Sequence, residues 1–362
     1  MLLAGGGTAG HTSPLIATAE QLRALGDVDI LCVGTPKGLE SRVIPEAGLE
    51  LALIPPVPLP RRVEPALFAV PVRLAEAVRE ARAVLRNHRA QVAVGYGGYV
   101  SLPVYLAARW ERVPIVLHEG NAVPGLANRI AARFTPNVVT TFPGTALPHA
   151  TQLGLPVRAA IAGLDRAALR PRAREAFGLP ADGRVLLVSG GSQGARSINQ
   201  AVLAAAETLL GEGISILHVL GPANLTAETI SRDDPATGAA YRPVGYVDDM
   251  ALAYAAADLM LGRSGAGTVM ETAMTGLPTI FVPLPHGNGE QARNADFLIN
   301  AGAGVLVADS ELTSDRLRRE VGRLLGDPAG LARMGQLCRS LAPSGAARAL
   351  AELVLRVAGR PH

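Results

Sequence analysis

Three glycine-rich turns contain the residues best suited to chemistry on a phosphate-bearing ligand. They span residues 5–11, 190–195 and 263–271, and each follows a short apolar run and precedes a helical pattern. Backbone N–H groups at a helix N-terminus converge on a bound anion, and the helix dipole adds to the attraction. Close packing of a strand against a helix would explain the glycines of any single turn equally well. Their recurrence favours ligand binding.

The first turn has the form Gly5-x-Gly7-x-x-Gly10, which matches the dinucleotide fingerprint. A dinucleotide-binding domain also needs an acidic residue at the tip of its second strand to hold the ribose. The second apolar run of this chain ends at Thr35 with no acid at the tip. The sequence therefore argues against NAD, and we predict that the protein uses no cofactor.

His11 distinguishes the first turn from the second, where Ala195 stands at the matching position. Packing of such a turn therefore does not require an imidazole. A histidine here could contact a pyrophosphate or accept a proton from a sugar hydroxyl near neutral pH. Capping of the following helix is the alternative, and we favour the functional interpretation.

The third turn is the most specific of the three. The N–H groups of Ala266, Gly267 and Thr268 would meet a diphosphate, and Glu271 would face the same ligand one helical turn later. Its carboxylate could accept both ribose hydroxyls, although a capping-box role is the alternative. Gln291-x-x-Asn294 follows at the next strand-to-helix turn, where amide side chains suit sugar hydroxyls.

The composition indicates a folded protein of a reducing compartment. The formal net charge of +3 over 362 residues is far below that of most nucleic-acid binders, so we predict no nucleic-acid partner. Two cysteines make neither a disulfide framework nor a metal cluster. No Asp-x-Asp motif lies at a strand end, and we predict no protein-bound metal. No signal-peptide pattern and no apolar run of membrane-spanning length is present, which predicts a cytoplasmic protein.

Short apolar runs alternate with longer segments of helical period, which predicts two doubly wound, parallel-sheet α/β domains. The expected strands and helices are, in the first half, strands 1–4, 30–33, 91–95, 115–117 and 137–140 with helices 13–25, 71–87, 102–110 and 125–132; in the second, strands 185–189, 214–220, 241–244, 259–261 and 278–282 with helices 197–210, 250–256, 267–274, 291–301 and 314–325. We place the domains at 1–158 and 159–342, with a helix within 343–362 returning to the first. This is the GT-B architecture, with an active site expected in the cleft between the domains.

Together these motifs resemble those of the MurG family, the undecaprenyl-pyrophosphoryl-muramyl-pentapeptide N-acetylglucosaminyltransferases. The matching stretches are 5–11, 95–101, 116–121, 190–196, 246–250, 263–271 and 291–295. The resemblance implies transfer of N-acetylglucosamine from UDP-N-acetylglucosamine to the 4-hydroxyl of the lipid-linked muramyl-pentapeptide, with inversion to a β-1,4 link. It also implies contact with the inner face of the cytoplasmic membrane and with cell-wall synthesis and division proteins.

The resemblance assigns site residues by position. The donor set is Thr8, Gly10, Asn121, Arg158, Ser192, Tyr246, Val247, Met250, Ala266, Gly267, Thr268, Glu271, Gln291 and Asn294. The acceptor set is Gly7, His11, Tyr99 and His118. The catalytic candidates are His11, as general base, and Glu119, as its rival. Leu155 and Glu290 depart from the family pattern.

A lipid-borne acceptor requires contact with a membrane surface. The mixed apolar and basic residues expected to make it are Leu59, Arg61, Arg62, Leu67, Phe68, Val70, Arg73 and Trp110. A buried loop and a helix end with solvated arginines would give the same pattern, and the resemblance favours the membrane. Two alternatives to the predicted function stay open: a GT-B transferase for another lipid acceptor, and a non-catalytic UDP-sugar sensor.

Overall fold

The computed structural model describes residues 1–57, 69–227, 229–286 and 289–359. The chain divides into two compact units. The first unit comprises residues 1–158 and the C-terminal segment from Pro343, and the second comprises residues 159–342. The chain thus leaves the first unit once and returns to it.

The first unit is built on a seven-stranded sheet in which every neighbouring pair is parallel. Its strands are β1 (Leu2–Ala4), β2 (Leu31–Gly34), β3 (Glu50–Leu53), β4 (Ala93–Gly95), β5 (Ile115–Glu119), β6 (Asn137–Thr140) and β7 (Ala150–Gln152). Their order is β3-β2-β1-β4-β5-β6-β7. The direction of winding therefore reverses between β1 and β4, and ligands of such sheets bind at the carboxyl ends near this reversal.

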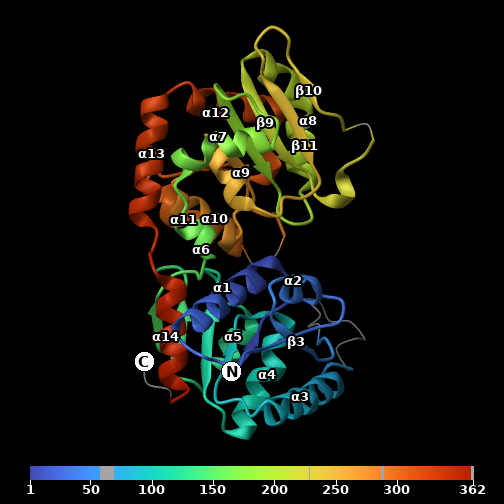
Figure 1. Ribbon diagram of the computed structural model, residues 1–362, viewed down its shortest axis with the longest axis vertical. Helices are drawn as coiled ribbons and strands as arrows, with labels where there is room; N and C mark the ends of the chain where they lie inside the picture. Colours follow the sequence, from blue (N-terminus) through green and yellow to red (C-terminus); the bar gives the residue numbers. More distant parts are fainter. Residues whose placement is uncertain (58–68, 228, 287–288, 360–362) are drawn as a thin grey trace. The chain divides into compact units, whose positions relative to one another are not determined.

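Helices cover both faces of this sheet. They are α1 (Ala9–Leu25), α2 (Glu40–Glu46), α3 (Val70–Asn87), α4 (Gly98–Glu111), α5 (Leu126–Ala131) and α14 (Ala346–Val357). Apolar residues of α1, α2 and α14 share one core with alternate residues of β1, β2, β4 and β5, and those of α3, α4 and α5 share the other. Helix α14 lies beside α1 (Figure 1) because its buried residues recur at helical spacing from Ala346 to Leu355.

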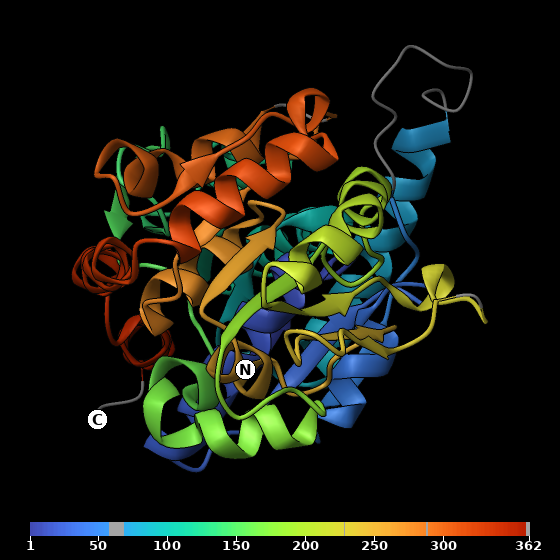
Figure 2. The same cartoon turned by 90° about the horizontal axis from the view of Figure 1, so that it is seen from above.

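The second unit repeats the design with seven further strands. They are β8 (Arg184–Ser189), β9 (Ile214–Val219), β10 (Arg232–Asp233), β11 (Ala240–Val244), β12 (Leu259–Gly262), β13 (Thr279–Phe281) and β14 (Val305–Leu306). The order is β10-β11-β9-β8-β12-β13-β14, and among the described strands of this sheet only the short edge strand β10 runs antiparallel to its neighbour. Figure 2 shows this unit, coloured from green to red along the chain, from above.

The helices of the second unit also flank its sheet. They are α6 (Ala159–Ala162), α7 (Arg166–Ala176), α8 (Arg196–Gly211), α9 (Met250–Ala256), α10 (Ala266–Thr275), α11 (Glu290–Asn300), α12 (Ser314–Leu325) and α13 (Pro328–Leu341), with the 3-10 turns η2 (Pro222–Asn224) and η3 (Asp309–Glu311). Helices α8 and α12 cover one face. Asp165, Asp249, Thr313 and Asp327 cap α7, α9, α12 and α13 by accepting N–H bonds from the first turn.

The predicted fold class, two doubly wound parallel-sheet α/β units, is confirmed. Most strands and helices expected from the sequence form, with bounds shifted by a residue or a few. Several unpredicted elements are short or polar: β3 and β7 have no buried residue, α2 contains Pro45, and α7 contains Pro171 among arginines. Such segments have no apolar period to reveal them. The 14-residue helix α13 was also not predicted, because Gly330 and Gly335 interrupt its helical pattern.

Helix α4 begins four residues earlier than expected. Gly97 and Gly98 both have positive φ, at 89° and 81°, and a Cβ on Gly98 would crowd the Gly6 carbonyl oxygen. This pair of glycines allows the backbone to turn directly into the helix. Among the described residues, no helix has both the length and the apolar composition needed to cross a membrane.

Candidate active site

The turn from β1 into α1 places His11 in the first turn of a helix, where the residue is partly buried. His11 Nδ1 lies 3.0 Å from the Gly6 carbonyl oxygen and 3.1 Å from Thr8 Oγ1. A carbonyl oxygen only accepts, so Nδ1 carries the hydrogen, and Nε2 is left with its lone pair. Burial lowers the pKa of His11, although the Gly6 carbonyl and the charge of Glu40 oppose that shift. The ring is therefore a neutral base at neutral pH.

The backbone of the turn from β4 into α4, at Gly97 and Gly98, packs beside the His11 ring. A Cβ on Gly97 would meet His11 Nε2 at 3.4 Å, so that nitrogen lies against the turn that opens α4. Tyr99 is 47% exposed, and a Cβ on Gly7 would lie 4.0 Å from Cδ2 of its ring. Ser101 Oγ, which sequence reasoning missed, donates to the carbonyls of Ala4 and Gly97 and joins the two turns.

Glu119 is a buried carboxylate at the end of β5, with 3% of its surface exposed. It accepts hydrogen bonds from the backbone N–H groups of Asn121 and Gly125 at 2.9 and 3.0 Å, and from Asn128 Nδ2 at 2.9 Å. Burial raises the pKa of Glu119 against the opposing effect of these bonds. These contacts hold the loop that carries Asn121. They suit a positioning role better than proton abstraction from a sugar.

His118 lies in β5, next to Glu119, and has no exposed surface. Its Nε2 donates to the Gly154 carbonyl oxygen at 3.1 Å, and burial lowers its pKa to about 4. The expected contact between His118 and the acceptor is not available in this structure, because the ring is covered on all sides. The departure at Leu155 has a simple cause: its side chain is buried and lies 3.9 Å from the Cβ position of Gly120. Arg158 is exposed where the first unit ends.

In the second unit, the turn from β8 into α8 exposes Ser192. The turn lies between Gly190 and Gly194, and neither glycine has room for a Cβ. Gly194 has φ of +76°, and a Cβ there would overlap the Leu220 carbonyl oxygen. Asn224 Nδ2 donates to the carbonyls of Gln193 and Leu220, and Asn199 Nδ2 donates to Leu220 as well. The turn is thus held in one conformation with Ser192 at its tip.

The turn from β12 opens α10 without any side-chain cap at its N-cap residue, Gly265. The first-turn N–H groups of the helix, on Ala266, Gly267 and Thr268, have no intrahelical carbonyl to bind. A capping-box glutamate stands third in a helix, whereas Glu271 stands sixth in α10. The capping alternative for Glu271 is therefore excluded by position. Its Oε2 instead accepts a hydrogen bond from the Tyr254 hydroxyl at 2.6 Å.

Supporting contacts fix the remaining donor-site candidates. Asn294 is fully buried and its Nδ2 donates to the Ser264 carbonyl oxygen, so it braces the α10 turn and has no exposed surface for a sugar. Gln291 Oε1 accepts from the Leu284 N–H. Tyr246 is 41% exposed and Val247 is buried just before α9, which begins at Met250.

An ion pair that sequence reasoning missed ties the segments after β12, β13 and β14 to the start of α8. Arg263 donates to Asp309 at 2.5 Å, to the Ser197 hydroxyl at 3.0 Å and to the carbonyls of Val282 and Pro283. Ser197 also donates to Asp309 at 2.6 Å. Burial raises the pKa of Asp309, but bonds from Ser197 and Arg263 outweigh it and hold the pKa low.

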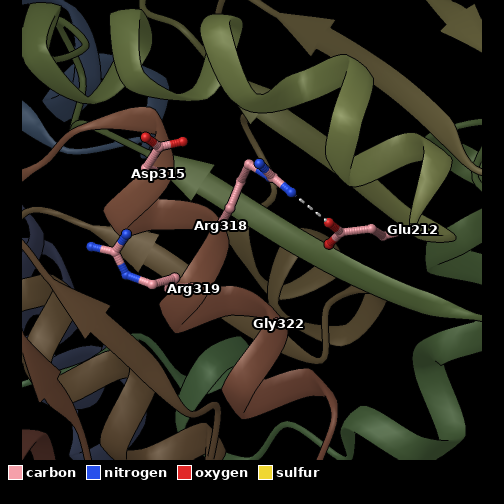
Figure 3. A pocket seen from close by; sticks show the side chains of 5 residues that line it. All are labelled: Glu212, Asp315, Arg318, Arg319 and Gly322. Atoms are coloured by element: carbon pink, nitrogen blue, oxygen red, sulfur yellow. Dashed lines mark hydrogen bonds and ion pairs between the residues drawn. The ribbon is translucent and has the colours of Figure 1, made fainter.

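Two surface hollows lie away from these turns. One, of about 320 Å³, is lined by Glu212, Asp315, Arg318, Arg319 and Gly322, and Figure 3 shows the Arg318–Glu212 ion pair at its rim. The other, of about 400 Å³, lies between α7 and α13. Neither contains a residue of the predicted donor or acceptor sets. Among the described residues, no group of three or more His, Cys, Asp or Glu is placed to hold a metal ion.

Two doubly wound parallel-sheet units with glycine turns at their strand ends are the architecture of GT-B glycosyltransferases. The N-terminal domain of glycosyltransferase family 28 matches residues 1–140, and the C-terminal domain of that family matches residues 185–348. The chain belongs to this family and, within it, to the MurG family predicted from its motifs, as the following relatives establish.

Relatives of high identity cover nearly the whole chain. The UDP-N-acetylglucosamine–N-acetylmuramyl-(pentapeptide) pyrophosphoryl-undecaprenol N-acetylglucosamine transferase of Cutibacterium acnes is 58% identical over 99% of this chain and 97% of its own. That of a Nocardioides species is 54% identical over 99% and 98%. The crystal structure of Acinetobacter baumannii MurG is 27% identical, with a TM-score of 0.75 over 98% of this chain and 99% of its own.

Proposed function

We propose that this protein transfers N-acetylglucosamine from UDP-N-acetylglucosamine to the 4-hydroxyl of the muramyl-pentapeptide pyrophosphoryl-undecaprenol lipid. The observation that carries the proposal is the state of His11: a neutral ring at a helix start, with hydrogen on Nδ1 and a lone pair on Nε2. Full-length relatives named for this reaction support the substrate pair.

The reaction is a single displacement. His11 Nε2 takes the proton from the acceptor 4-hydroxyl while that oxygen attacks the anomeric carbon from the face opposite UDP. The bond from the anomeric carbon to the β-phosphate oxygen breaks, and UDP leaves with the electron pair. The configuration at the anomeric carbon therefore inverts from α to β.

The departing UDP is held by the second unit. The uncapped N–H groups of Ala266, Gly267 and Thr268 bind the diphosphate, where the α10 dipole favours the growing negative charge. Glu271, fixed by Tyr254, accepts the ribose hydroxyls. Tyr246 and Val247 contact the uracil, and Ser192 approaches the phosphates. Oriented N–H groups stabilise the leaving group, and we infer that the enzyme needs no bound metal.

The experiment is transfer of radiolabelled N-acetylglucosamine to a short-chain muramyl-pentapeptide lipid, with and without EDTA. Wild-type product that resists the chelator is expected. His11→Ala should lower kcat about 100-fold or more with little change in donor KM, because a general base contributes roughly 10²–10⁴-fold. His149→Asn is the matched control, since His149 is exposed and its φ of +59° suits asparagine.

Contrary outcomes identify the alternatives. Loss of activity in Glu119→Gln with an active His11→Ala would move the base to Glu119. Tight binding of UDP-N-acetylglucosamine without transfer to this lipid would instead indicate another lipid acceptor, and no transfer to any polyprenyl acceptor would indicate a sensor.

We further propose that the first unit binds the inner face of the cytoplasmic membrane. Val72 at the start of α3 is 72% exposed, beside Val70 and Arg73, and Trp110 on α4 is 68% exposed. The Arg82 guanidinium lies 4.5 Å from the centre of the Trp110 ring, which combines an aromatic anchor with positive charge. The other residues predicted to touch the membrane, Leu59, Arg61, Arg62, Leu67 and Phe68, lie outside the described residues.

Vesicle sedimentation tests this surface. Trp110→Ala should lower binding to vesicles containing anionic lipid several-fold, whereas Leu203→Ala, at an exposed apolar residue on α8, should not. Equal binding by the Trp110 variant would remove Trp110 from the proposed surface.

A further inference from the structure

Glu40 is a fully buried carboxylate that the mechanism above does not use. It begins α2, and its side chain folds back toward the turn between β1 and α1. Gly6, Gly34 and Gly38 surround it, and a Cβ on any of the three would overlap the Glu40 side chain. Three glycines from separate segments therefore leave the space that this carboxylate fills.

Hydrogen-bond donors keep this buried group ionised. Oε2 accepts the Gly7 N–H at 2.8 Å, and Oε1 accepts the Thr35 N–H at 2.9 Å and the Thr35 hydroxyl at 2.8 Å. Burial pushes the pKa of Glu40 upward, but bonds from Gly7 and Thr35 outweigh it, so the pKa lies below its usual value. Within the described residues, no cation lies within ion-pair distance of this carboxylate.

One peptide group joins Glu40 to His11. The N–H of Gly7 and the carbonyl of Gly6 belong to the same peptide unit. Its N–H donates to Glu40, and its carbonyl oxygen accepts the hydrogen of His11 Nδ1. A carboxylate that binds the N–H polarises the peptide and makes its carbonyl a stronger acceptor. The chain runs from carboxylate to peptide to imidazole without a gap.

We propose that Glu40 is a positioning residue for the transfer reaction. Through the Gly6–Gly7 peptide it holds His11 with hydrogen on Nδ1, and it stabilises the imidazolium that forms when Nε2 takes the acceptor proton. The imidazolium later releases that proton to solvent, and the neutral ring returns. This inference rests on the proposed role of His11 as the base.

Other titratable groups stand near the ring and enter any pH measurement. They are His118, whose pKa the charge of His11 lowers, and Tyr96 and Tyr99, which lie against the glycines of the turn that carries His11; Glu119 follows His118 on β5. His118 stays neutral down to about pH 4, since burial lowers its pKa to about 4, and burial raises the pKa of Tyr96 far above neutral pH. Glu40 is the group whose negative charge raises the pKa of His11.

The test compares Glu40→Gln with Glu46→Gln on the same helix, where Glu46 is exposed and paired with Arg42. Loss of the outer partner that orients a metal-binding histidine costs about 10–100-fold in activity, and we take the same range for a histidine that acts as a base. We expect kcat of Glu40→Gln to fall by that factor, with the KM for UDP-N-acetylglucosamine unchanged. The acid limb of the kcat profile should move to lower pH, because the anion that favours the imidazolium is gone. The Glu46 variant should behave as wild type.

Nitrogen-15 NMR of labelled histidine tests the link without turnover. The wild-type spectrum should show the His11 resonance with hydrogen on Nδ1. Glu40→Gln should populate the other tautomer, because the Gly6–Gly7 peptide is then no longer held with its carbonyl toward Nδ1. Wild-type kcat, pH profile and tautomer in this variant would overturn the proposal. A fall in kcat with an unmoved pH profile and tautomer would also overturn it, by assigning Glu40 a purely structural role.

Two further variants separate the possible failures. If Glu40→Gln does not fold, Glu40→Asp retains the charge but withdraws it by one methylene, and lower kcat with a changed tautomer is expected. Wild-type values in Glu40→Asp would contradict the proposal. An active His11→Ala would refute the base assignment itself, whereas an unchanged tautomer in the Glu40 variants would refute only the link.

Discussion

Replacing Tyr254 by phenylalanine tests how the donor ribose is held. The Tyr254 hydroxyl donates to Glu271 across 2.6 Å, and the tyrosine is buried. Burial and the Glu271 charge raise the pKa of Tyr254 well above its usual value, so the hydroxyl stays a donor throughout the assay range. Without it, Glu271 loses the bond that orients its carboxylate.

The expected size follows from that bond. A hydrogen bond to a charged group contributes about 1.5–3 kcal/mol. If roughly half of this is lost from donor binding, the Kd for UDP-N-acetylglucosamine rises about three- to tenfold, since ~1.4 kcal/mol is a factor of ten. The variant should also discriminate less against the 2′-deoxyuridine analogue, because Glu271 would then bind the ribose hydroxyls less well.

Isothermal titration of both donors measures the affinity and the discrimination. Tyr241→Phe is the matched control, because Tyr241 is a buried tyrosine of the same unit whose hydroxyl lies 3.0 Å from His218 Nδ1. It should lower the unfolding temperature without changing donor affinity. The reasoning fails if Tyr254→Phe leaves both Kd values unchanged, or if it weakens binding equally when Glu271 is already alanine.

Three further predictions follow from other contacts. Burial lowers the pKa of His118 and of His218 to about 4, below the ordinary value of about 6.5, so the unfolded chain binds more protons between these values. The stability that these two histidines contribute is complete above about pH 6.5 and is lost as the pH falls toward 4. Calorimetry should show a lower unfolding temperature at pH 5 than at pH 7. In His218→Gln the unfolding temperature should fall less between these two pH values. Gly194→Ala should weaken UDP binding and lower the unfolding temperature more than Gly191→Ala, whose Cβ meets open space although both φ values are positive; equal effects in both assays would show that φ alone decides. Asp309→Asn should raise the donor KM several-fold with a smaller change in kcat, because it weakens the ion pair that joins the strand-end loops; an unchanged KM in steady-state kinetics would contradict this.

Regular elements with an apolar pattern could be predicted from the sequence. Helix α10 was expected at 267–274 and spans Ala266–Thr275, because a buried strand, a glycine turn and a helical period succeed one another there. The same pattern placed His11 in the turn just before a helix expected at 13–25, whereas α1 begins earlier, at Ala9, and includes His11 in its first turn. Local spacing is sufficient for such features, since each turn is built from neighbouring residues.

Contacts between distant residues could not be predicted in this way. The sequence showed no acid at the tip of the second strand, yet Glu40, five residues after Thr35, folds back and accepts its N–H. The glycine turn predicted an anion, and the anion on the Gly7 N–H is a carboxylate of the chain itself. Tyr254 and Asp309 likewise reach their partners only through the folded sheet, 17 and 46 residues away.

The place of α14 in the first core has a consequence for synthesis of the protein. Leu350, Val354 and Leu355 share a buried cluster with Leu3 and Leu15, although the whole second unit is translated between them. On the ribosome, residues 159–342 emerge before α14, so the face of the first sheet that α1 and α2 cover still lacks its third helix at that time. The second unit can therefore fold before the first, and the part of the chain made earliest is the last to become stable. Until α14 emerges, the apolar face around α1 is the surface that a chaperone would have to protect.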